Sequence, residues 1–195
     1  EFVDAPLIDE LPIALECNLI SFDEETCRLV GEIVNVSVDE RVSMERIIRH
    51  FVYAHGFRDI CFMTGRMELE DAQLRFECYK RIMEEAGIEV TEDMVFYGDY
   101  WRMKAKAAVD HFFAGRTNTY PQAIVCANDY MALAVCQELG ERGIRVPEDI
   151  SVIGMDNIHS TDHIEPQLTS IDTGYDEACR IAWELLCKKM DNPYH

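Results

Sequence analysis

The sequence predicts an α/β fold in which a parallel sheet carries helices on both faces. Short β-branched runs alternate with longer segments of helical periodicity, which is typical of strand and helix units in succession. Pro121 and Pro147 each fall just before a predicted strand, where a fixed φ and a missing N–H favour a loop. Gly87 follows a predicted helix, as a C-terminal capping residue commonly does.

The predicted strands are short apolar runs rich in β-branched and aromatic residues. By contrast, Asn18–Gly31 has weak periodicity and mixed polarity, so we expect a loop or an irregular excursion there. The strands are expected at Ile13–Cys17, Ile33–Val38, Asp59–Thr64, Met94–Tyr97, Ala123–Ala127 and Ile150–Gly154.

Helices are predicted where apolar residues recur at steps of three and four positions. In one of them, Met131, Val135 and Leu139 share a face, and Asn128 stands where it can cap the N-terminus. The helices are expected at about Ser43–Ala54, Asp71–Ala86, Lys104–Phe113, Asp129–Arg142 and Tyr175–Lys189.

The charge balance argues against direct binding of nucleic acid. The chain has 18 Lys and Arg against 37 Asp and Glu, a formal net charge of -19, and the acids are spread along the sequence. Affinity for DNA depends on cations that neutralise phosphates, so any contact with DNA is expected from a domain absent from this chain.

The cysteines and the apolar segments favour a cytoplasmic location. The 8 cysteines lie at irregular spacings without a C-x-x-C pair, and several fall inside apolar runs, which indicates buried thiols in a reducing compartment. No signal peptide opens the sequence, and no run approaches the ~18 apolar residues of a membrane span. We therefore expect no membrane association.

The segment from Ala123 to Ile171 carries several motifs in a fixed order. They read A-N-D-x-M-A-L, then G-x-x-V-P-E-D-I-S-V-I-G-x-D, then P-x-L-T-S-I. Upstream, HGFRDICFMTG is followed by Arg75, Phe76 and Tyr79, and LPIALE lies near the start. Together these motifs resemble the effector-binding domain of LacI/GalR-family transcriptional regulators, from about Leu11 to the end of the chain.

The resemblance implies a Rossmann-like, periplasmic-binding-protein-like fold of two lobes. Residues 1–38 would belong to an N-terminal lobe that is incomplete in this chain, and 39–171 would form the C-terminal lobe. Residues 172–195 would be a helix that returns to the N-terminal lobe.

It also implies a sensor rather than an enzyme, without a cofactor. A small polar metabolite such as a sugar would bind in the cleft between the lobes of a homodimer, and closure would be passed to the DNA-binding domain. Two alternatives share the sensor module. It could be fused to another output, either a signalling enzyme such as a diguanylate cyclase or a different DNA-binding domain, or it could be the solute-binding protein of a sugar transporter.

The residues that match the family's binding pattern are Arg75, Tyr100, Asn128 and Asp156. Asn128 and Asp156 follow predicted strands, at the edge where open α/β sheets bind ligands. Their amide and carboxylate groups suit sugar or nucleoside hydroxyls, and the Arg75 guanidinium offers several donors. Tyr100 is expected to stack on the ligand ring, and the adjacent Trp101 competes for that role.

Each of these residues also has a structural interpretation. Asn128 could cap its helix, Asp129 could stabilise the first helical turn, and Asp156 could form an Asx turn with Asn157. Packing alone could explain either aromatic side chain.

Arg75 could instead form a surface ion pair with Asp71 or Glu70. Asp71 is also a candidate ligand contact, because acids ahead of the arginine favour a polyol, a sugar or a cationic ligand over a phosphorylated one. We expect alanine at Arg75 or Asp156 to abolish a ligand response with little change in the melting temperature of the free protein.

Catalytic and metal sites are disfavoured. His159, Asp162, His163 and Glu165 lie in one short segment, but Pro166 argues against a rigid helical metal site. No nucleophile elbow, P-loop, dinucleotide fingerprint or zinc-protease motif occurs. The central expectation is that Asn128, Asp156, Arg75 and Tyr100 converge on a common hollow.

Overall fold

A computed structural model describes residues 13–23, 28–38, 41–117, 119–158, 167–174, 179–181 and 183–184. The chain forms two compact units. The larger unit is Glu40–Thr173, and the smaller unit combines Glu1–Asp39 with Gly174–His195.

The larger unit contains a 5-stranded sheet in which every neighbouring pair is parallel. Its order is β4-β3-β5-β6-β7, so successive strands are joined by crossovers rather than hairpins. The strands are β3 (Ile60–Thr64), β4 (Val95–Tyr97), β5 (Ala123–Cys126), β6 (Ser151–Met155) and β7 (Thr169–Ile171).

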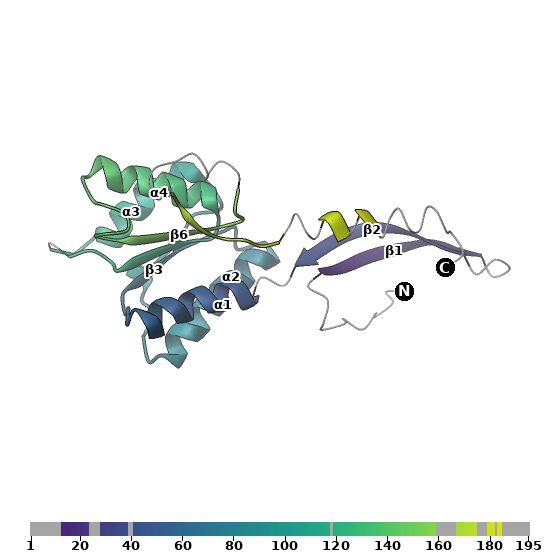
Figure 1. Ribbon diagram of the computed structural model, residues 1–195, viewed down its shortest axis with the longest axis horizontal. Coiled ribbons are helices and arrows are strands. Elements are labelled where there is room, and N and C mark those ends of the chain that lie inside the picture. Colours follow the sequence, from purple (N-terminus) through teal and green to yellow (C-terminus); the bar gives the residue numbers. More distant parts are fainter. Residues whose placement is uncertain are drawn as a thin grey trace. The chain divides into compact units, whose positions relative to one another are not determined.

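Helices cover both faces of this sheet, as Figure 1 shows. The helices α1 (Arg41–Arg49) and α2 (Glu70–Glu85) pack against each other on one face, and α3 (Ala105–Phe113) and α4 (Asp129–Glu141) do so on the other. Every residue of β3 and β5 is buried, as expected for strands sandwiched between helices. The predicted α/β fold with a parallel sheet is confirmed.

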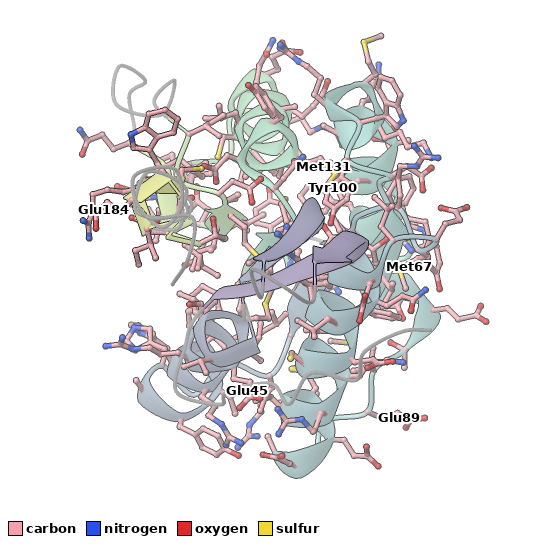
Figure 2. All side chains as sticks on the ribbon, turned by 90° about the vertical axis from the view of Figure 1, so that its right-hand side faces the viewer. Glu45, Met67, Glu89, Tyr100, Met131 and Glu184 are labelled. Carbon is pink, nitrogen blue, oxygen red and sulfur yellow. The ribbon has the colours of Figure 1, made fainter. Side chains whose placement is uncertain are left out.

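The core joins α2 to β3 through aromatic side chains. The rings of Phe62 and Tyr79 stack with their centroids 5.0 Å apart, and the Tyr79 hydroxyl donates a hydrogen bond of 2.7 Å to the Ile60 carbonyl oxygen. Burial raises the pKa of Tyr79, so this hydroxyl stays protonated as a donor. Charged side chains such as Glu45 and Glu89 lie at the periphery of the unit (Figure 2).

The helix predicted at Ser43–Ala54 is present, but its last turn is wider than an α-helical turn. After α1, the residues His50–Ala54 form a π-helix, and the His55 N–H donates to the His50 carbonyl oxygen at 3.3 Å. Phe51 and Val52 are buried in this turn, which Gly56 follows with a φ of 69°.

The smaller unit contains an antiparallel pair of strands, β1 (Ile13–Asp23) and β2 (Arg28–Val38). The loop predicted for Asn18–Gly31 is therefore wrong, because its described residues 18–23 and 28–31 belong to these strands. Register irregularities between Glu16 and Cys17 and between Leu19 and Ser21 break the alternation that would have revealed them. The short connection also makes the pair antiparallel instead of parallel.

In the C-terminal part, the strand β7 was not predicted. The helix expected at Tyr175–Lys189 lies mostly outside the described residues, and the residues of that range that are described, 179–181 and 183–184, are helical. Among the helices that the structure describes, none is both long enough and apolar enough to cross a membrane.

Candidate functional site

The loops at the carboxyl ends of the strands form one edge of the sheet, where the candidate residues gather. The backbone at this edge is unusual, because Asp99, Tyr100, Asp156 and Asn157 all have positive φ values, between 49° and 100°. Non-glycine residues adopt such conformations only when the surrounding structure holds them, and they concentrate at ligand sites. We call this region the carboxyl edge.

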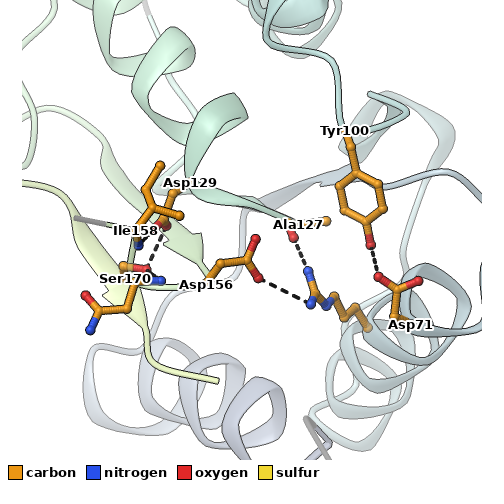
Figure 3. Close-up of polar contacts among 9 residues, drawn as sticks. Asp71, Tyr100, Ala127, Asp129, Asp156, Ile158 and Ser170 are labelled. Atoms are coloured by element: carbon orange, nitrogen blue, oxygen red, sulfur yellow. Dashed lines mark hydrogen bonds and ion pairs between the residues drawn. The ribbon is translucent and has the colours of Figure 1, made fainter. Parts of the chain in front are cut away.

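Arg75 lies at the centre of the carboxyl edge. It projects from α2 and is only 2% exposed. One guanidinium nitrogen donates to the Ala127 carbonyl oxygen at the end of β5, and the other lies 3.4 Å from Asp156 Oδ1 beyond β6 (Figure 3). The Asp156 side chain is 26% exposed, so the ion pair is buried on one side and reachable on the other.

Tyr100 is fixed against this ion pair. Its ring centroid lies 5.9 Å from the Arg75 guanidinium carbon, and its hydroxyl donates to Asp71 Oδ2 at 2.6 Å (Figure 3). Gly65 lies directly beside the ring, since an added Cβ there would come within 2.2 Å of a ring carbon. The ring therefore occupies a place that only glycine at position 65 leaves open.

The structure thus brings Arg75, Asp156, Tyr100 and Asp71 together, but it places Asn128 and Trp101 differently. Asn128 Oδ1 accepts the Met131 N–H at 2.9 Å, which is the helix-capping role that the sequence left open. Trp101 is 61% exposed, whereas Tyr100 packs against the core, so Tyr100 is the aromatic that lies beside Arg75.

Burial of Arg75 contradicts one sequence-based interpretation and changes one expectation. A surface ion pair with Asp71 or Glu70 is wrong as an account of Arg75, because the side chain is buried and reaches Ala127 and Asp156. Alanine at this position would leave the buried Ala127 carbonyl oxygen without this donor. We therefore expect Arg75→Ala to lower the melting temperature of the free protein.

Asp129 is a further residue of this edge, and its buried role was not predicted. It is 0% exposed and accepts hydrogen bonds from the Ser170 hydroxyl at 2.7 Å and the Ile158 N–H at 2.9 Å. Burial raises the pKa of Asp129, and the donors of Ser170, Ile158 and Asn157 oppose that rise. The sequence signal was its place after Asn128, which favoured a role in the first helical turn.

Two open hollows of the larger unit lie away from the Arg75 and Tyr100 side chains. One of about 340 Å³ lies between α1 and β7, lined by residues such as Arg46, His50 and Asp172. Another of about 410 Å³ lies at the amino ends of the strands, beside Asp59 and Arg116. The described residues include no cluster of three or more side chains that could hold a metal ion, and the segment with His159 and His163 lies outside them.

A family model for the periplasmic-binding-protein-like domain matches residues 48–195. The chain belongs to this family. A related protein is the HTH-type transcriptional repressor PurR of Pasteurella multocida, 37% identical over 121 residues, which are 62% of this chain and 36% of the repressor. The match is to the LacI/GalR type of effector-binding domain, as the sequence motifs predicted.

Solved structures of LacI-family regulators agree with this assignment. One is a sugar-binding regulator of Escherichia coli complexed with phosphate, with a TM-score of 0.63, 29% identity and coverage of 69% of this chain and 47% of that one. Another is the CelR regulator in complex with cellobiose, with a TM-score of 0.67, 27% identity and coverage of 78% and 46%. This effector-binding domain thus spans less than half the length of each of these proteins.

These relatives and neighbours are transcriptional regulators and not enzymes, in agreement with the sequence-based prediction of a sensor. The effector-binding domain is the part of such a regulator to which the matched residues correspond.

Proposed function

We propose that this effector-binding domain recognises a small, uncharged, polyhydroxylated metabolite such as a sugar at the carboxyl edge. The observation that carries the proposal is the buried Arg75 guanidinium, which is held by the Ala127 carbonyl oxygen and paired with a partly exposed Asp156. A guanidinium and a carboxylate side by side offer both donors and acceptors, which is what a ligand with several hydroxyl groups requires.

The charges at this edge support a neutral ligand over a phosphorylated one. Arg75 is already paired with Asp156. Asp71 and Asp129 add two further carboxylates, which accept hydrogen bonds from the neutral hydroxyls of Tyr100 and Ser170. A phosphate would meet net negative charge there, whereas hydroxyl groups would not. The cellobiose complex of the CelR neighbour is an example of an uncharged ligand in a related protein.

Tyr100 would give the ligand ring an apolar face. Its ring is fixed by the hydrogen bond to Asp71 and by the contact with Gly65, so little side-chain entropy is lost on binding. A sugar ring placed against it would bury its apolar C–H face while its hydroxyl groups reach Arg75 and Asp156.

Ligand binding would act as a switch through closure of two lobes. A ligand that binds the closed form better than the open form shifts the population towards closure, and no covalent step is needed. Because the chain has a net charge of -19, it would act on DNA only through a separate DNA-binding domain. The regulator would work as a homodimer in the cytoplasm.

A thermal-shift screen tests this function. Sugars, polyols, nucleosides and amino acids would be added to the purified chain, and a ligand at 100 times its Kd should add about 2.7 kcal/mol of stability. Asp156→Asn should remove the response to any hit, because the carboxylate beside Arg75 loses one acceptor. Arg116→Met, at the opposite edge of the sheet, is the matched control and should respond fully. A full response of Asp156→Asn would contradict the proposed site.

A further inference from the structure

Asp129 joins two segments that flank the candidate site. It is the first residue of α4, yet its carboxylate points into the protein and not along the helix surface. Figure 3 shows its dashed contacts to Ser170 on β7 and to Ile158 beyond β6. One carboxylate therefore links β7 to the segment that follows β6.

A second hydrogen bond extends this contact to the residue next to Asp156. The Asn157 N–H donates to Ser170 Oγ at 3.0 Å, and the same hydroxyl donates to Asp129 Oδ1. The Asp156 N–H itself donates to the Ile171 carbonyl oxygen at 3.0 Å. The backbone on both sides of the Asp156 side chain is thus tied to β7.

The conformation of Asp156 needs such support. Its φ of 100° and the φ of 49° at Asn157 are unfavourable for residues with a side chain. In a relaxed extended conformation, the Asp156 side chain would leave the direction that brings it 3.4 Å from Arg75.

The surroundings of Asp129 are built for a carboxylate. An added Cβ at Gly154 would come within 2.1 Å of Asp129 Oδ1, so glycine at this position leaves the space that the carboxylate fills. The donors around it are the Ser170 hydroxyl and the Ile158 N–H, which offset part of the cost of burying a negative charge.

We propose that Asp129 is a positioning residue for ligand recognition, because it holds the 156–158 backbone in the conformation that presents Asp156 to Arg75. It acts through Ser170, Asn157 and Ile158. The part of this inference that concerns ligand affinity rests on the proposed function, whereas the part that concerns the Arg75 and Asp156 pair does not.

Asp129→Asn in the full chain is the decisive variant. It keeps the shape of the side chain, but it replaces an acceptor oxygen by an NH₂ group that faces the donors of Ser170 or Ile158. The matched control is Asp59→Asn, which removes a carboxylate from an Arg–Asp ion pair at the opposite edge of the sheet.

The primary measurement needs no ligand. Amide hydrogen exchange at Asn157 and Ile158 should accelerate about tenfold or more in Asp129→Asn, since each 1.4 kcal/mol of lost local stability is a factor of ten. The side-chain NMR signals of the Arg75 guanidinium should change with it, while Asp59→Asn leaves both unchanged. Uniform acceleration over the whole sheet, or unchanged Arg75 signals, would overturn the positioning role.

Ser170→Ala gives a second variant in case Asp129→Asn folds poorly. It keeps the carboxylate and the Ile158 contact but removes the hydroxyl between Asn157 and Asp129, so exchange should accelerate at Asn157 more than at Ile158. An equal acceleration of exchange at the Asn157 and Ile158 amides, relative to the wild type, would contradict the proposed chain of hydrogen bonds.

Cellobiose serves as the ligand probe. If it binds the wild-type chain, Asp129→Asn should raise its Kd about tenfold and Asp59→Asn should leave it unchanged; an unchanged Kd in Asp129→Asn would overturn the effect on affinity. If no compound of the screen stabilises the wild-type chain, the proposed function fails, and the exchange and NMR measurements still decide the role of Asp129.

Discussion

The two ends of the strands in the five-stranded sheet each carry an ion pair between an arginine and an aspartate, and the two pairs differ. We call the region where the strands begin, beside Asp59 and Arg116, the amino edge. At the amino edge, Arg116 Nη2 donates to Asp59 Oδ1 at 2.9 Å, and a second guanidinium nitrogen contacts the other carboxylate oxygen. At the carboxyl edge, Arg75 Nη2 lies 3.4 Å from Asp156 Oδ1. Arg116 is partly exposed, whereas Arg75 is buried.

The backbone differs in the same direction. At the amino edge, Gln122 Oε1 accepts the N–H groups of Arg58 and Asp59 at 2.7 and 3.0 Å. At the carboxyl edge, the loops carry the positive φ values of Tyr100 and Asp156. At the amino edge, the ion pair is bidentate and the neighbouring backbone N–H groups are hydrogen-bonded. At the carboxyl edge, residues such as Asp156 hold backbone conformations that cost free energy. Such cost is characteristic of a binding site.

The largest expected effect is on the free energy of unfolding when the arginine of each edge is replaced by methionine. Arg75→Met should lower the free energy of unfolding by about 3 kcal/mol, because the Ala127 carbonyl oxygen loses this donor and Asp156 loses this cation. Arg116→Met should cost about 1 kcal/mol, since its ion pair is partly solvated. Urea unfolding of the two variants measures the difference.

Ligand response sharpens the same comparison. Only Arg75→Met should lose the thermal shift produced by a hit of the screen. Equal losses in the free energy of unfolding for the two variants would remove the distinction between the two edges. Loss of the ligand-induced thermal shift in Arg116→Met would do the same.

A smaller effect is expected from two glycine substitutions. Gly154→Ala should destabilise the protein by about 2 kcal/mol, because its Cβ would overlap the Asp129 carboxylate. Gly140→Ala in α4 meets no atom within 4 Å and should stabilise by about 0.5–1 kcal/mol through helix propensity. Thermal unfolding would reveal opposite signs, and a neutral Gly154→Ala would show that the edge can relax.

The smallest expected effect is the dependence of stability on pH, which has opposite signs for Asp149 at the amino edge and Asp129 at the carboxyl edge. Hydrogen bonds from Arg145 lower the pKa of Asp149, in the turn before β6, from 3.8 to about 2. Its contribution to stability is therefore present above pH 3.8 and is lost as the pH falls through about 2. Burial raises the pKa of Asp129, so its contribution becomes unfavourable as the pH rises above 3.8.

Carbon NMR titration of the carboxylates checks both directions. Arg145→Met should return the pKa of Asp149 towards 3.8 and leave that of Asp129 unchanged. An Asp149 pKa that stays near 2 in this variant would show that the Arg145 guanidinium is not the cause of the shift, since the backbone N–H of residue 145 still donates to Asp149.

Most of the sheet and helices of the larger unit could be predicted from the sequence, because burial gives them a clear period. The helix at Asp71–Ala86 and the strand at Ala123–Ala127 were predicted within about a residue of their observed bounds. The strand Thr169–Ile171 is too short to show a period, and the hairpin strands were obscured by register irregularities.

The site was predictable only in part. The resemblance to LacI/GalR regulators named Arg75, Tyr100 and Asp156, which the fold brings together from three separate elements. It could not give the buried role of Asp129, because the donors that hold it come from Ile158 and Ser170, far along the chain. Spacing in the sequence carries no information on such long-range hydrogen bonds.

The π-helix at His50–Ala54 has a consequence for chain length. A π-turn contains one residue more than an α-turn, so a one-residue deletion within 50–54 can restore the regular spiral and still deliver the chain to β3 in register. The same deletion in the middle of α2 would rotate every later side chain by about 100° and expose Tyr79. Insertions and deletions in this domain are therefore best tolerated where one helical turn already holds a surplus residue.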